Sequence, residues 1–344
     1  RKRAGVITDN LAREDMRANA DSDAAAAMKR VTGLSVVDNQ YVYVRGLGER
    51  YSNTMLNGGV LPTTEPDKRV VPLDLIPTGL IESVQVVKSY LPDRPAEFSG
   101  GLIQIESVKS PRETSMSVSN KQGYNTQTTW SDGLSYTGGG LDWLGFDDGI
   151  RELPDVIPAG KVTRSSPFNP GVGFSQQELE RFGASFNNIW QPTSEGQSHD
   201  PDFSTSWGTR RGDLGLALSL GYRGKTRTRT EDQTFYSVGV DAAGDPRLEV
   251  QNDYDFDLTE TKTRLGGVGN AAYELGNGHR FSWANFWTHN SRDEARTFEG
   301  FNSDIATDIR NSRLYWIEED ILSSTLRGEH LISSFLNSRI DWRV

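Results

Sequence analysis

The chain has 344 residues, no cysteine and a formal net charge of −10, which exclude disulfide and thiolate chemistry and argue against nucleic acid as a partner. Only 35% of the residues are hydrophobic and the mean hydropathy is −0.58, too little apolar content for the core of a soluble globular protein of this length. A large transmembrane β-barrel tolerates this composition because only every second strand residue faces lipid, although a β-sandwich or a propeller would show similar numbers.

Neither end of the chain has the features of a natural terminus. Arg1-Lys-Arg precedes no apolar signal-peptide core, and no run of about 18 apolar residues predicts a transmembrane helix. The last residues, 340–344, stop inside an alternating run. We therefore expect a piece of a longer protein.

The first element is predicted to be helical, within residues 9–30. Asp21-Ser-Asp23 provides an N-terminal cap for the helix formers Ala24-Ala-Ala-Ala-Met-Lys-Arg30. Gly33 fits a C-terminal stop. Short apolar strands follow, of which Tyr41–Val44 and Ile81–Val87 are the clearest. Both faces of the second strand are partly apolar, which is typical of a strand buried inside another structure.

Several short motifs in this part carry a family resemblance. The motifs are, in order, Val31-Thr-Gly-Leu, Tyr41-Val-Tyr-Val-Arg-Gly, Met55-Leu-Asn-Gly, Leu73-Asp-Leu-Ile-Pro, Ile81-Glu-Ser-Val-Gln-Val-Val-Lys and Gly100-Gly-Leu-Ile-Gln-Ile. With these motifs the chain resembles the plug domain of TonB-dependent outer-membrane receptors; the resemblance is strong over about residues 20–110 and only architectural over 111–344.

Beyond about residue 114 the pattern changes to long alternating strands. Apolar residues recur at every second position over segments of about ten residues, the signature of an outer-membrane barrel. The clearest rows begin at Phe203, Leu214, Leu265 and Phe281. Roughly six complete strands and the start of a seventh are expected, against about 22 in a plugged receptor.

Connection lengths favour a barrel over a sandwich. Turns at 211–213, 276–278 and 332–334 are short, whereas 241–247, 300–310 and 131–200 are long. Short periplasmic turns that alternate with long extracellular loops are typical of outer-membrane barrels. Inside the longest loop, a capping box of Ser175 and Glu178 predicts a helix over Gln176–Ile189.

No motif for catalysis emerges. The four His are scattered, Gly-x-Ser-x-Gly is absent, and Arg45-Gly-Leu-Gly-Glu-Arg lacks the third glycine of a dinucleotide loop. Glu318-Glu-Asp320 is expected on a solvated face. Asp253, Asp255 and Asp257 share one strand face, where Ca²⁺ binding is possible but a solvated face is favoured. We predict no enzyme, no cofactor and no metal site.

The resemblance implies an α+β plug domain over residues 1–111, followed by all-β residues 112–344. The second part would be the first antiparallel strands of a transmembrane barrel in the outer membrane of a Gram-negative bacterium. The implied function is ligand-gated import of a ferric siderophore, cobalamin or an oligosaccharide, energised by TonB through a box upstream of Arg1. The alternative is a sensory or adhesive receptor of the same architecture. A soluble polysaccharide hydrolase would need a clustered carboxylate pair.

Two sets of site residues carry over by position. Arg45 and Lys88 would lock the plug to glutamates of the barrel wall, the lysine less firmly because it lacks a bidentate fork. Ligand contacts are expected at three polar plug loops around 38–40, 49–52 and 62–69. The candidates are Asp38, Asn39, Gln40, Glu49, Arg50, Tyr51, Thr63, Glu65, Lys68 and Arg69.

Overall fold

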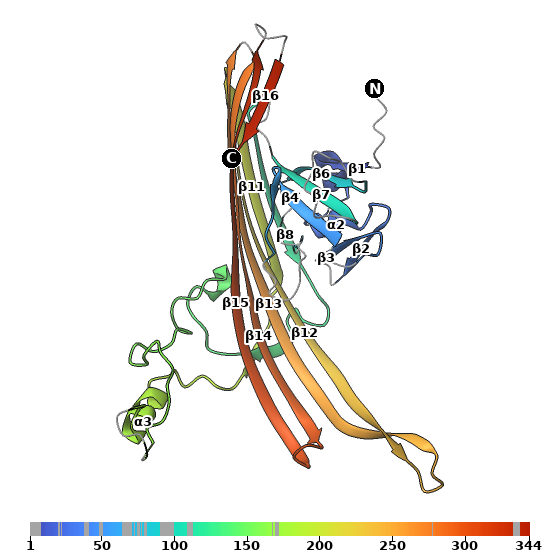
Figure 1. Ribbon diagram of the computed structural model, residues 1–344, viewed down its shortest axis with the longest axis vertical. Coiled ribbons are helices and arrows are strands. Elements are labelled where there is room, and N and C mark those ends of the chain that lie inside the picture. The colour runs from blue at the N-terminus through green and yellow to red at the C-terminus, as the bar shows by residue number, and fades with distance from the viewer. Residues whose placement is uncertain are drawn as a thin grey trace.

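The computed structural model consists of a small N-terminal domain seated against one face of a tall, curved sheet (Figure 1). In the described part of the chain, no helix has the length and apolar character needed to cross a membrane. The structure describes residues 8–19, 21, 23–37, 41–47, 51–63, 71, 73, 76, 78, 81–89, 100–108, 113–166, 168, 172–276, 278–332 and 338–344.

The N-terminal domain is built on a five-stranded sheet with strand order β1-β6-β7-β4-β5. Strands β4 and β7 run parallel and the other neighbours antiparallel, while β2 and β3 form a separate hairpin. The elements are β1 (Thr8–Ala12), α1 (Arg13–Ala18), α2 (Ala24–Met28), β2 (Leu34–Val37), β3 (Tyr41–Val44), β4 (Ser52–Leu56), β5 (Gly59–Val60), β6 (Ile81–Val87) and β7 (Gly101–Ser107).

The prediction of a helix over residues 9–30 was only partly right. Residues 8–12 form a strand because they pair with the otherwise open edge of β6, and that tertiary pairing overrides local propensity. Helix α2 is capped as expected, since the Ala26 N–H donates to Asp23 Oδ1 at 2.9 Å. Gly33 adopts a left-handed φ of 71°, beyond the helix end at Met28, in the turn that leads to β2.

One hydrophobic cluster fills this domain and continues into the tall sheet. Its members from the small domain are almost completely buried, for example Met28, Ile81 and Ile105 at 0% exposure. Val268, Phe286 and Ile321 of the tall sheet belong to the same cluster. The two parts therefore share a continuous apolar contact.

The tall sheet, called the wall below, has the antiparallel order β16-β15-β14-β13-β12-β11-β8. The sequence predicted six complete strands and the start of a seventh, and the structure has seven strands in this sheet. Strands extend farther than expected at 300–310, where only 303–306 separate β14 from β15. The elements are β8 (Ser115–Gly123), β11 (Asp200–Arg211), β12 (Leu214–Val240), β13 (Pro246–Gly276), β14 (His279–Asn302), β15 (Thr307–Ile332) and β16 (Ser338–Arg343).

The long connection between β8 and β11, residues 124–199, lies on the opposite side of the wall from the N-terminal domain (Figure 1). It carries β9 (Asp132–Ser135), paired with β10 (Thr193–Gly196), and the 3₁₀ helix η4 (Asp142–Leu144). Helix α3 (Gln176–Ala184) has the predicted Ser175–Glu178 capping box but ends five positions before Ile189. It buries none of its residues, so no packing extends it.

Candidate functional site

The outer face of the wall, turned away from the N-terminal domain, carries a band of exposed apolar side chains. Cross-strand rows such as Leu220–Gly267–Trp287–Leu322 lie on this face. The side chains of Leu218, Leu220, Trp283 and Leu322 are each at least 47% exposed. From Leu214 to Tyr222 the band runs about 27 Å along the strand. At a barrel tilt of about 40° this is about 20 Å along the barrel axis, comparable to the roughly 25 Å height of a lipid-facing apolar band.

Of the predicted ligand contacts, only Tyr51 and Thr63 lie in the described part of the chain. Tyr51 precedes β4 and is 50% exposed, while its carbonyl oxygen accepts a hydrogen bond from Gly100 N–H at 2.7 Å. Its ring is therefore accessible on a fixed backbone. The others fall outside the described residues, namely Asp38, Asn39, Gln40, Glu49, Arg50, Glu65, Lys68 and Arg69.

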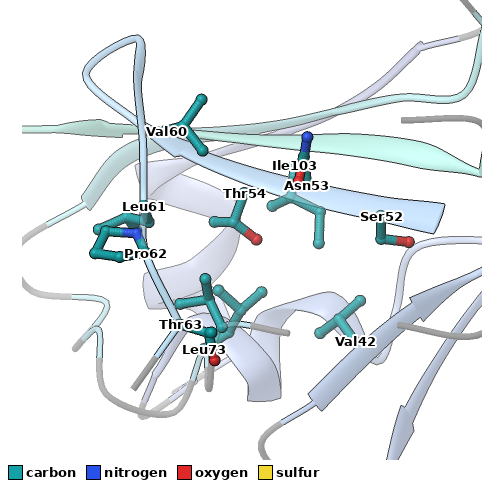
Figure 2. A pocket seen from close by; sticks show the side chains of 11 residues that line it. Val42, Ser52, Asn53, Thr54, Val60, Leu61, Pro62, Thr63, Leu73 and Ile103 are labelled. Atoms are coloured by element: carbon teal, nitrogen blue, oxygen red, sulfur yellow. The ribbon is translucent and has the colours of Figure 1, made fainter. Parts of the chain in front are cut away.

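Thr63 lines a small cavity inside the N-terminal domain (Figure 2). Its volume is about 180 Å³, and its walls are mostly apolar, with Val42, Leu61 and Ile103 among them. Pockets for drug-sized ligands occupy about 300–1,000 Å³. The cavity has room for a few waters and is too small for a chelate or an oligosaccharide.

Lys88, predicted to fasten the N-terminal domain to the wall, is bound within its own domain. Its ammonium donates to the Asp9 carboxylate of β1 and to the Thr32 carbonyl oxygen, and the residue is only 8% exposed. The charge is thus satisfied locally and ties β1 to the turn before β2. This partner was not foreseeable while residues 9–12 were expected to be helical.

Arg45 has an exposed side chain and a left-handed φ of 57°. Among the described residues it makes no ion pair. Its backbone is that of a turn residue, since Gly46 beside it also has a positive φ of 69°. The lock between Arg45 and a glutamate of the barrel wall stays a prediction.

The ion pair that joins the domain to the wall has its charges the other way round from the predicted lock, in which cations of the small domain would meet glutamates of the wall. Arg223 Nη1 lies 3.5 Å from Asp23 Oδ2, and the same guanidinium is bound to Asp202. Asp23 therefore has two roles, as cap of α2 and as partner of the wall. Asn270 Nδ2 adds hydrogen bonds to Ser107 Oγ, at 3.1 Å, and to the Val108 carbonyl oxygen. Here the wall supplies the cation and the small domain the carboxylate.

A charged cleft of about 500 Å³ opens on the inner face beside this contact. Basic side chains outnumber carboxylates in its lining, and Arg227 is paired with Asp200 at 2.8 Å. Burial, followed by the nearby Arg227 guanidinium, lowers the pKa of Lys225. The basic residues are Lys121, Arg223, Lys225, Arg227, Lys262 and Arg264. This surface attracts anionic groups.

On the outer face, just beyond the apolar band, the 124–199 connection docks on polar residues of the wall. His289 is fully buried there, with its ring stacked on Phe146 at 3.9 Å. Its Nε2 lies 2.8 Å from the Gly145 carbonyl oxygen and its Nδ1 3.1 Å from Asp320. Both partners are acceptors, so the ring satisfies both only when each nitrogen carries a proton.

Asp293 lies on the same outer face, farther from the band. Burial raises its pKa to about 6, opposed by the Tyr136 hydroxyl and the Arg151 guanidinium. Its Oδ1 is buried without a hydrogen-bond partner among the described residues. The ionised carboxylate is therefore poorly compensated while the connection covers it.

Several sequence predictions about polar residues need revision in this region. Glu318 and Asp320 do not lie on a merely solvated face: Glu318 accepts from Asp147 N–H at 2.6 Å, and Asp320 binds His289. The wall also brings His279 and His330 to 3.0 Å, a cross-strand pair that sequence spacing did not reveal. Among the described residues no three His, Cys, Asp or Glu side chains gather to hold a metal ion.

Comparison with known proteins decides the identity of the N-terminal domain. Residues 2–92 match the family model of the TonB-dependent receptor plug domain. The chain carries the plug of a TonB-dependent outer-membrane receptor. Its location is the outer membrane of a Gram-negative bacterium. The predictions of a plug domain and of an outer-membrane location are thereby confirmed, and the strands after residue 112 are antiparallel as expected.

Solved structures of outer-membrane receptors and transporters align with most of the chain, at low sequence identity and with TM-scores below 0.5. The alcaligin receptor FauA of Bordetella pertussis shares 11% identity and a TM-score of 0.33, with 96% of this chain and 60% of that chain covered. The Escherichia coli transporter YddB shares 10% and 0.35, with 94% and 45% covered. The ferric enterobactin receptor PfeA of Pseudomonas aeruginosa, as its R480A mutant, shares 12% and 0.30, with 96% and 61% covered.

The chain thus spans less than two thirds of the length of these three structures. A comparison with curated protein sequences finds no match.

Proposed function

We propose that this chain is the plug and the first barrel strands of a TonB-dependent, ligand-gated importer of the outer membrane. The observation that carries the proposal is the position of the plug. It packs through Val268, Phe286 and Ile321 on the wall face opposite the apolar band, so lipid and plug occupy different sides of the same strands. A domain packed on the lipid-facing side would have argued against transport.

The division of the chain follows from this proposal. Residues 1–111 form the plug and residues 112–344 begin a barrel that closes with about 22 strands. TonB acts through a segment upstream of Arg1. Among the described residues, the polar contacts that fasten the plug to the wall are Asp23–Arg223 and the hydrogen bonds of Asn270, whereas Lys88 is paired with Asp9.

The ligand we favour is an anionic chelate. The plug loops contribute Tyr51 with Arg50 and Lys68, and the inner wall adds the surplus of basic groups around Lys225. Anionic ligands gain from such a focused positive potential, whereas neutral sugars and cobalamin do not.

The test uses the full-length receptor in outer-membrane vesicles and in cells. Ferric chelates, cobalamin and oligosaccharides are titrated separately, and uptake is followed with and without TonB. We expect saturable binding of a ferric chelate at micromolar or lower concentration, uptake only with TonB, and weaker binding after Tyr51→Ala or Arg50→Gln.

The matched control is Val60→Ala, because Val60 is 53% exposed in the same domain but lies outside the predicted loops. TonB-independent responses would favour a sensory or adhesive receptor. Normal binding by the Tyr51 and Arg50 variants would refute the site assignment while leaving import intact.

A further inference from the structure

A second cleft lies outside the lumen, on the outer face of the wall. It has a volume of about 690 Å³ and is enclosed by residues 149–155 and 185–190 of the 124–199 connection together with Leu314 and Trp316 of β15. Trp316 faces outward because its cross-strand partner on β14 is Asp293, which lies on the outer face four positions from His289. The cleft is therefore separated from the plug and from the import route by the wall itself.

The lining of this cleft combines aromatic rings with hydrogen-bonding groups. Trp190 is 62% exposed and its ring centroid lies 6.2 Å from that of Phe186. Glu152, Asp155 and Asn187 supply carboxylate and amide groups around it. An exposed indole face packs against the apolar C–H face of a sugar ring, and these polar groups bind sugar hydroxyls.

The cleft is fixed before any ligand arrives. The Arg151 guanidinium lies 4.0 Å above the Trp316 ring and is held by Asp142 and Asp147 at 2.6 and 2.9 Å. Asn187 Nδ2 donates to the Ile150 carbonyl oxygen at 2.9 Å and so joins the two sides. Binding to such a preorganised site loses little side-chain entropy.

Charge selects between ligand classes. The positive charge of Arg151 is already balanced by Asp142 and Asp147, which leaves Glu152 and Asp155 as the carboxylates of the lining without an ion-pair partner among the described residues. Phosphate-rich headgroups are repelled by this potential. Neutral sugars and amino sugars are not.

We propose that this outer-wall cleft, formed by Trp190, Trp316, Glu152, Asp155 and Asn187, binds an uncharged or amino-bearing saccharide. The cleft lies beyond the lipid-facing band, since Trp316 is six residues from Leu322 along β15, and this position corresponds to the level of the sugars on the outer leaflet. Two sources present that chemistry there, the neutral sugars and amino sugars of the lipopolysaccharide core oligosaccharide and soluble glycans. The site is independent of the imported ligand.

The test measures binding of two probes to the full-length receptor in lipid nanodiscs. One probe is dephosphorylated lipopolysaccharide core oligosaccharide and the other is maltoheptaose. Calorimetry and quenching of tryptophan fluorescence report saturable binding. We expect at least one probe to bind, and Trp190→Ala to weaken it about tenfold or more, the loss of roughly one stacking contact.

The matched control is Trp130→Ala, because Trp130 is 77% exposed in the same connection but does not line the cleft. Core oligosaccharide binding identifies the membrane as the source, and binding of maltoheptaose alone identifies soluble glycans. The proposal is overturned if neither probe binds, or if Trp190→Ala and Trp130→Ala weaken binding equally. Chelate uptake by Trp190→Ala is expected to stay normal, so the two proposals fail separately.

Discussion

The plug and the wall are both β-sheets rich in apolar residues, yet they bury those residues against different surroundings. In the plug, apolar side chains such as Ile105 and Ile81 are 0% exposed because helices and a second layer cover them. In the wall, Leu218 and Leu322 remain 49% and 75% exposed on the outer face. Apolar residues on both faces of a strand therefore mark a packed core in the plug, whereas apolar residues on one face mark a lipid-facing surface in the wall.

The largest expected effect is in the plug core. Ile105→Ala leaves a cavity and is expected to lower the free energy of plug unfolding by about 2–5 kcal/mol. Chemical denaturation of the full-length receptor in lipid vesicles, followed by plug hydrogen exchange, measures the change. Val37→Ala, at a 44% exposed plug position, is the control and should cost far less. Equal losses would mean that the plug has no distinct core.

A charge introduced on the outer band should distinguish the surroundings of the two sheets more clearly than a cavity does. Leu218→Arg places a cation in the middle of the lipid-facing band and is expected to cost about 2–4 kcal/mol of stability. Val60→Arg in the plug, at nearly the same exposure of 53%, should change stability by less than about 0.5 kcal/mol. Urea unfolding in vesicles compares the two. Similar costs would show that Leu218 does not face lipid.

Lower pH should strengthen the docking of the outer connection. The folded pKa of Asp293 is raised to about 6, above its unfolded value, so the protonated acid favours docking. This contribution is nearly absent at pH 7.5, grows as pH falls through 6, and reaches about 1 kcal/mol at pH 5. Hydrogen exchange of residues 136–151 at the two pH values measures it.

Asp293→Asn should remove this component, and Asp253→Asn, at an exposed position on β13, should not. An unchanged pH dependence in Asp293→Asn would assign the whole effect to groups other than Asp293.

The smallest effect concerns the link between the two sheets. Asp23→Asn keeps the cap of α2 but removes the charge opposite Arg223, at an expected cost of about 0.5–1 kcal/mol because Arg223 retains Asp202. Asp23→Ala should cost about 1 kcal/mol more through loss of the cap. A double-mutant cycle with Arg223→Gln, read as plug release by limited proteolysis, isolates the pair. A coupling of zero would remove Asp23 from the fastening.

Much of the local structure was determined by the sequence itself. Alternation from Leu214 to Tyr222 specified the strand and the set of apolar residues that share one of its faces. Which of the two faces points away from the plug was decided by the packing of the plug. The turns at 211–213 and 276–278 and the Ser175–Glu178 capping box were equally readable, because each depends on residues within a few positions.

Only the tertiary structure decided which distant residues meet. Residues 8–12 became a strand because β6 offered an edge, and Lys88 took Asp9 as its partner for the same reason. The meeting of His289 with Gly145, and of Asp23 with Arg223, joins residues far apart in the chain. Such contacts depend on how the sheets pack, which no local propensity records.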